Sequence, residues 1–95
     1  MTENNTVAAG DVPLLNPLYL LRWEEPQQAH VMLYPEGVVK LNETAAAILL
    51  LCDGQRTAAD IVADLNSRYT NADVSAGVYR FLETSHAKGW IRIKS

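Results

Sequence analysis

Residues 30–42 read HVMLYPEGVVKLN and combine three structural signals: two short apolar runs, a tight turn between them and a helix cap after them. In the turn, Pro35 has the φ that the second turn position needs, and Gly37 tolerates the left-handed conformation that follows in bulged hairpins. Asn42 is a favoured N-cap residue. We therefore predict an antiparallel β-hairpin that leads directly into a helix.

The residues on either side of this turn alternate with a period of two, which is typical of a half-buried antiparallel pair. One face is apolar and is predicted to meet the core: Val31, Leu33, Val39 and Leu41. The other face is mixed in character and is predicted to be more exposed: His30, Met32, Tyr34, Val38 and Lys40.

The segments before the hairpin predict one further strand and an arm. Residues 19–24 form the strand, with Leu21 and Trp23 on one face, and they complete a three-stranded antiparallel meander. Residues 1–17 are polar and are interrupted by Pro13 and Pro17, so they are expected to be a flexible N-terminal arm. Residues 18–95 are then one domain.

Three helices are predicted after the meander. The first covers residues 43–52 and is apolar nearly all round, so it should be buried. The second opens at Thr57, which forms an acidic capping box with Asp60, and the third runs from 74 to about 88 behind Asp73. Residues 90–93 are either a short strand or an apolar tail. The predicted fold is α+β and winged helix-turn-helix-like: an N-terminal three-stranded antiparallel meander followed by three helices.

Composition and charge limit the class of protein. The chain has 95 residues, 48% of them hydrophobic, which suffices for one core without disulfides or a metal. The single Cys52 ends the apolar helix and is interpreted as a buried hydrophobe. Neither a signal peptide nor an apolar run of about 20 residues is present, so a cytoplasmic location is expected. The formal charge of −3 argues against nucleic-acid binding.

The sequence offers no recognisable catalytic machinery. His30 and His86 are the only histidines, and neither has the spacing of a metal site. We find no nucleophile paired with a base and no cofactor loop. The chain is therefore expected to be no enzyme and to hold neither a metal nor a cofactor.

A set of residues spread over roughly 18–91 resembles the PqqD family: Trp23, the tracts 29–37 and 40–42, Ala45, Ile48-Leu49, the tract 52–54, Ile61-Val62, Leu65 and the tract 89–91. The resemblance implies a peptide chaperone of pyrroloquinoline quinone (PQQ) biosynthesis. Such a chaperone captures the ribosomally made precursor peptide and presents it to the radical-SAM enzyme of the pathway. Related domains are the recognition elements of many modified-peptide pathways.

The resemblance also implies where the peptide binds. In the related recognition domains the leader peptide becomes an extra strand beside the third strand and against the third helix. The strand side corresponds here to Val38, Val39, Lys40 and Leu41, and a helical wheel places Ser75, Tyr79, Leu82 and His86 on the helix side.

Some of these residues also have plain structural interpretations. Lys40 is the candidate to meet an acidic peptide side chain, or else a charge that protects an edge strand from aggregation. Tyr79 and Leu82 alternatively belong to the margin of the core.

Two other functions stay open at this point. The predicted topology also fits a winged-helix DNA-binding regulator, which the net charge opposes. The exposed strand edge also fits a small structural dimerisation module, and a homodimer in crystals is compatible with it.

Overall fold

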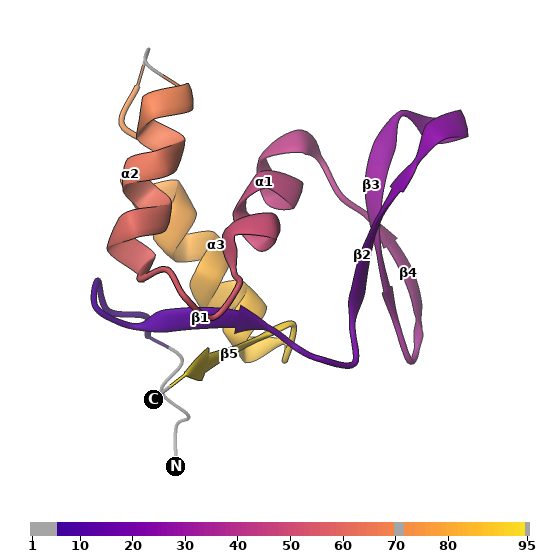
Figure 1. The fold of residues 1–95 in the computed structure, drawn as a ribbon, viewed down its shortest axis with the longest axis horizontal. Helices are drawn as coiled ribbons and strands as arrows, with labels where there is room; N and C mark the ends of the chain where they lie inside the picture. The colour runs from indigo at the N-terminus through magenta and orange to yellow at the C-terminus, as the bar shows by residue number, and fades with distance from the viewer. Residues whose placement is uncertain (1–5, 70–71, 95) are drawn as a thin grey trace.

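The computed structural model describes residues 6–69 and 72–94. The elements occur in the order β1 (Val12–Leu15), β2 (Leu20–Glu24), the 3₁₀ turn η1 (Glu25–Gln27), β3 (Ala29–Tyr34), β4 (Gly37–Lys40), α1 (Glu43–Leu51), α2 (Ala58–Arg68), α3 (Ser75–Ala87) and β5 (Ile91–Lys94). Figure 1 shows the sheet of β2, β3 and β4 on one side of α1, with α2 and α3 on the other. The predicted α+β order, a meander followed by three helices, is confirmed.

The central hairpin forms at the predicted residues, but its register is continuous over residues 31–40 and it lacks the bulge that the turn residues predicted. Tyr34 lies opposite Gly37, so Pro35 and Glu36 are the two loop residues, and Gly37 has a positive φ of 152°. β2 pairs antiparallel with the other side of β3, which gives the strand order β2-β3-β4. Both β2 and β4 are therefore edge strands.

The predicted core face of β3 is wrong. Because Tyr34 lies opposite Gly37, Met32 lies opposite Val39, and residues that are directly opposite share a face. Met32 is fully buried in the core, while Val31 and Leu33 lie on the outer face. A one-residue difference in register exchanges the two faces of a strand, and the turn geometry, which fixes the register, outweighs the apolar pattern.

The sheet thus has two distinct faces. The inner face packs against α1 and includes half-buried or buried apolar residues: Leu21, Met32, Tyr34, Val39 and Leu41. Val39 and Leu41 lie where the sequence predicted. On the outer face Val31 is buried, although it is outside the core cluster, and it lies between Arg22 and Lys40 across the sheet.

The starts of α1 and α2 follow the predicted caps, whereas the N-cap of α3 is Val74, whose side chain makes no capping bond, and not the predicted Asp73. Asn42 Oδ1 accepts the Ala45 N–H at 2.7 Å, and Thr57 and Asp60 form the reciprocal capping box. The Asp73 carboxylate accepts the Ser75 N–H at 2.9 Å, so it stabilises the start of α3.

Five residues of α1 from Ala45 to Leu49 are buried, and burial raises the pKa of the Cys52 thiol to about 12. Cys52 is thus the inert hydrophobe that the sequence predicted.

The N-terminal segment is more ordered than a flexible arm. β1 pairs antiparallel with β5, with Leu15 opposite Ile91, and Val7 is buried in the core. The N–H groups of Ala58 and Ala59 donate to the carbonyls of Asp11 and Ala9 at 2.8 and 3.0 Å. The described part of the predicted arm therefore packs on the domain, while residues 1–5 lie outside the described residues.

Candidate functional site

The free edge of β4 presents backbone groups from alternate residues. The Leu41 N–H donates to the His30 carbonyl at 2.9 Å, which marks Leu41 and His30 as a hydrogen-bonded pair. In an antiparallel ladder every second residue makes such a pair, so Val39 and Gly37 also direct their backbone groups to β3. The N–H and C=O groups of Val38 and Lys40 consequently point away from β3, toward the free edge.

The charge at this edge is uncompensated. Lys40 is exposed, and it forms no ion pair with any residue in the described ranges 6–69 and 72–94. At the opposite edge, by contrast, the Arg22 guanidinium contacts the Glu24 carboxylate at 2.7 Å. The β4 edge therefore offers both unpaired backbone groups and a free cation to an incoming chain.

A hollow of about 390 Å³ opens between α1 and α3, close to the end of β4. Asn42, two residues after β4 ends, is one of its lining residues, so the hollow adjoins the end of the strand. Its wall on α1 is formed by Thr44, Ala45 and Ile48, and its wall at α3 by Asp73, Val74, Gly77, Val78 and Phe81. Gly77 has no side chain, and an added Cβ would meet nothing within 4 Å, so the wall is open at this point.

One charged group, Asp73, lies at the α3 end of this hollow. Hydrogen bonds from the Ser75 side chain and backbone N–H hold the pKa of the Asp73 carboxyl below its ordinary value. The hollow is thus mostly apolar, with Asp73 negatively charged at neutral pH.

The helix-side residues predicted from the helical wheel are placed elsewhere: none of Ser75, Tyr79, Leu82 and His86 lines the hollow. Leu82 is fully buried in the core, and the other three are half-buried. Tyr79 follows Gly77 by two residues, which is about 200° around an α-helix, so it lies on the opposite flank. Glu83, one turn after Tyr79 on that flank, accepts the Val7 N–H at 3.0 Å.

Sequence reasoning missed the residues that form the α3 wall. Val74, Gly77 and Phe81 are spaced by three and four residues and so share one flank of the helix. The sequence signal for this flank is Gly77, which has no side chain and lies between Val74 and Phe81 on the same side of the helix. The sequence alone did not show that α1 would pack alongside it.

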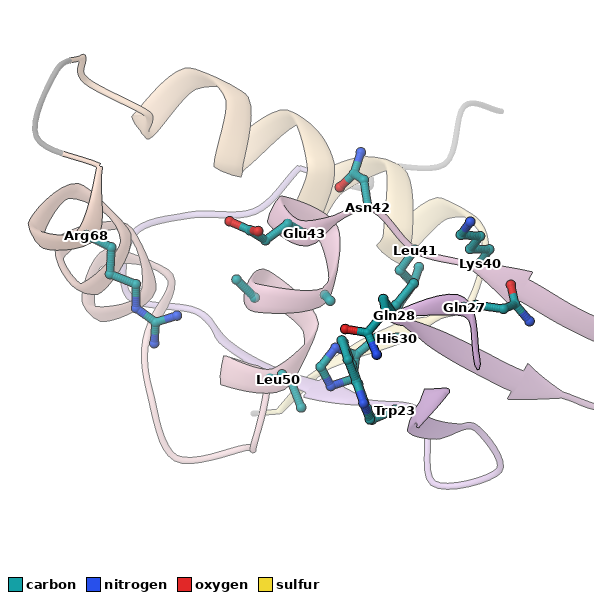
Figure 2. A pocket seen from close by; sticks show the side chains of 13 residues that line it. Trp23, Gln27, Gln28, His30, Lys40, Leu41, Asn42, Glu43, Leu50 and Arg68 are labelled. Carbon is teal, nitrogen blue, oxygen red and sulfur yellow. The ribbon is translucent and has the colours of Figure 1, made fainter. Parts of the chain in front are cut away.

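A second hollow of about 480 Å³ lies on the other side of α1 (Figure 2). Trp23 and His30 form one wall and pack edge to face, with ring centroids 5.1 Å apart. Figure 2 shows Leu50 near these two rings and Arg68 at the opposite end. Leu50 is 51% exposed, so this side of α1 is the exception to the buried helix that the sequence predicted.

The described residues contain no recognisable metal centre or membrane span. Across 6–69 and 72–94, no group of three His, Cys, Asp or Glu side chains could hold a metal ion. Within the same ranges, no helix is long and apolar enough to cross a bilayer. The candidate site described above consists of the free edge of β4 and the hollow between α1 and α3.

A family model and individual relatives of this chain agree on the family that it resembles. Residues 29–91 match the family model described as coenzyme PQQ synthesis protein D (PqqD). The chain is 50% identical over 78 residues to the PqqA binding protein of Methylococcus capsulatus, which is 82% of this chain and 84% of that protein. It is 53% identical over 74 residues to the PqqA binding protein of Klebsiella pneumoniae, covering 77% and 80% of the two chains.

A solved structure is similar to this chain in fold. It is the solution NMR structure of the PqqD truncation of Methylobacterium extorquens PqqCD, which represents a functional, stand-alone recognition element for ribosomally synthesised and post-translationally modified peptides. The TM-score is 0.77 at 29% sequence identity, and the match covers 93% of this chain and 96% of that one.

Proposed function

Because the chain belongs to the family of coenzyme PQQ synthesis protein D, we propose that it binds the PqqA precursor peptide of the PQQ pathway. The curated relatives are PqqA binding proteins, and the structural relative is a recognition element for modified peptides. In this function the chain acts by binding alone. It works in the cytoplasm, where the precursor is made, and presents the bound peptide to the radical-SAM enzyme of the pathway.

The strand side of the proposed site is the free edge of β4. Val38 and Lys40 supply backbone donors and acceptors to an added strand, while Val39 and Leu41 hold β4 in place through β3. Backbone pairing of this kind provides affinity for an extended peptide, and side-chain pockets provide selectivity. This outward direction of two successive donor–acceptor sites is the observation that carries the proposal.

On the helix side, we assign the peptide to the flank of α3 that carries Val74, Gly77 and Phe81. This flank borders a hollow that adjoins the end of β4, so one extended chain reaches both. The wheel-based set of Ser75, Tyr79, Leu82 and His86 stays an alternative prediction. Against it, Leu82 has no exposed surface, and the N-terminal segment contacts the same flank at Glu83.

A titration of fluorescently labelled PqqA peptide into the protein tests the function. Saturable binding at one site per chain is expected, together with a complex of peptide, protein and radical-SAM enzyme in gel filtration. Absence of peptide binding would overturn the proposal. Duplex DNA serves as the competing ligand: tight binding with a steep salt dependence would instead support a winged-helix regulator.

A further inference from the structure

The outer face of the sheet carries two rows of side chains with different chemistry. In the first row Leu20, Leu33 and Val38 lie directly opposite one another across all three strands. Leu20 and Val38 are 63% and 61% exposed, although both are large apolar residues. In the second row, Arg22, Val31 and Lys40 are aligned in the same way, with a cation at each end.

Both rows end at the free edge of β4, at the two residues whose backbone groups point outward. A strand that pairs with Val38 and Lys40 places its own residues directly opposite them, on the same outer face of the sheet. Its side chains therefore extend the two rows by one member each. The residue between these two points to the inner face, where Val39 lies.

We infer that the bound peptide carries an acidic side chain opposite Lys40 and an apolar side chain opposite Val38, two residues apart in its sequence. This inference rests on the proposed peptide-binding function and specifies which peptides that site selects. The Lys40 ammonium lacks an ion-pair partner within the described residues, so a carboxylate opposite it is favoured and a second cation is disfavoured. An apolar side chain opposite Val38 removes exposed apolar surface from water.

The spacing of two residues does not depend on strand direction. In an antiparallel strand the acidic residue comes first along the peptide, and in a parallel strand the apolar residue comes first. Cross-strand pairs of this kind change binding by about 1.5- to 5-fold each. These side-chain pairs provide selectivity among peptides, while the backbone hydrogen bonds provide affinity for any extended peptide.

A charge exchange tests the inference. Synthetic PqqA peptides, each with one Asp or Glu changed to Lys, are titrated into the wild-type protein and into Lys40→Glu. For one peptide of the series, the affinity for the wild-type protein should be about 3- to 5-fold weaker than that of unmodified PqqA. With the Lys40→Glu protein the order should reverse, so that the same peptide binds more tightly than unmodified PqqA. The matched control is Arg22→Glu, in the same row at the β2 edge, which should leave the order of affinities unchanged.

A second exchange tests the apolar row. A PqqA peptide is made with Lys two residues from the carboxylate that the first series identifies. This peptide should bind Val38→Glu more tightly than unmodified PqqA does, and it should bind the wild-type protein more weakly than unmodified PqqA does. If unmodified PqqA binds the wild type but no peptide exchanges its preference with either variant, the inference is wrong and the proposed function stands. If unmodified PqqA fails to bind the wild type, the proposed function itself fails.

Discussion

The two edges of the three-stranded sheet are alike in backbone geometry and differ in what lies beside them. The alternation that exposes Val38 and Lys40 on β4 exposes Leu21 and Trp23 on β2. At β2, neighbouring side chains bond to each other: Arg22 with Glu24 at 2.7 Å, and the Trp23 Nε1–H with Glu25 at 2.9 Å. At β4, Lys40 is exposed, and the hollow between α1 and α3 adjoins the end of the strand. The larger hollow beside α1 is lined by Trp23 of β2 as well as by Lys40 of β4, so a hollow next to an open edge is insufficient to define a peptide site. The β4 edge differs from the β2 edge in Lys40, which has no ion-pair partner among the described residues, and in the hollow between α1 and α3.

The largest expected effect is on the free energy of unfolding, through helix α1, which packs against the sheet between its two edges. α1 packs against β3, and Leu49 of α1 is almost completely buried. Leu49→Ala should lower the free energy of unfolding by about 2–5 kcal/mol, because it leaves a cavity in the core. Leu50→Ala is the matched control, since Leu50 is half exposed and should change it by about 0.5 kcal/mol or less. Urea unfolding followed by circular dichroism measures both, and a loss below about 1 kcal/mol for Leu49→Ala would show that α1 is peripheral.

Proline substitutions distinguish the edges directly. Lys40→Pro removes an N–H from the free edge of β4 and should weaken PqqA binding about tenfold. Lys40→Ala, which keeps the N–H and loses only the charge, should weaken it less. Val39→Pro should instead lower the stability of the fold, because the Val39 N–H faces β3 and its loss removes a bond within the sheet.

The corresponding pair at the other edge is Trp23→Pro and Trp23→Ala, which should bind PqqA equally well. Fluorescence anisotropy with labelled peptide provides the affinities, and thermal melts confirm that each variant is folded. Loss of binding in Trp23→Pro but not in Trp23→Ala would move the added strand to β2.

A pair of alanine substitutions distinguishes the two flanks of α3. Phe81→Ala should weaken PqqA binding by about 1 kcal/mol, or about fivefold, because Phe81 lines the hollow next to β4. Tyr79→Ala, on the opposite flank, should leave the affinity unchanged. Both residues pack against the core, so each affinity is compared with the unfolding free energy of the same variant. The reverse result would favour the helix residues predicted from the wheel.

The smallest effect is expected at Ser85, away from both edges. Its hydroxyl is buried and has no hydrogen-bond partner within the described part of the chain. Ser85→Ala should therefore raise the free energy of unfolding by up to about 1 kcal/mol and leave PqqA binding unchanged. A loss of more than about 1 kcal/mol in urea unfolding would mean that the hydroxyl makes a stabilising bond.

Local signals predicted the elements well and their packing less well. Pro35 and Gly37 determined the turn, and Asn42 and Thr57 marked the helix starts, because each acts on its nearest neighbours. The face of β3 was mispredicted because a side-chain period of two fits either register, and the two-residue turn decides between them. The pairing of β1 with β5 joins the two ends of the chain, and no local pattern indicates such a partner.

The candidate site was predictable on its strand side only in part. The third strand was identified as an edge, but which of its four residues face outward depended on the register. On α3 the wheel separated a core stripe from two flanks. Which flank borders a hollow depends on where α1 packs, which is a tertiary property.

Hydrogen exchange of the backbone amides, measured by NMR with and without PqqA peptide, tests strand addition at β4 most directly. In the free protein the amides of Val39 and Leu41 should exchange slowly, while those of Val38 and Lys40 exchange fast. Adding peptide should slow Val38 and Lys40 and leave Leu21 and Trp23 at the β2 edge fast. If Val38 and Lys40 stay fast at saturating peptide, or if Leu21 and Trp23 slow instead, the peptide does not add to β4.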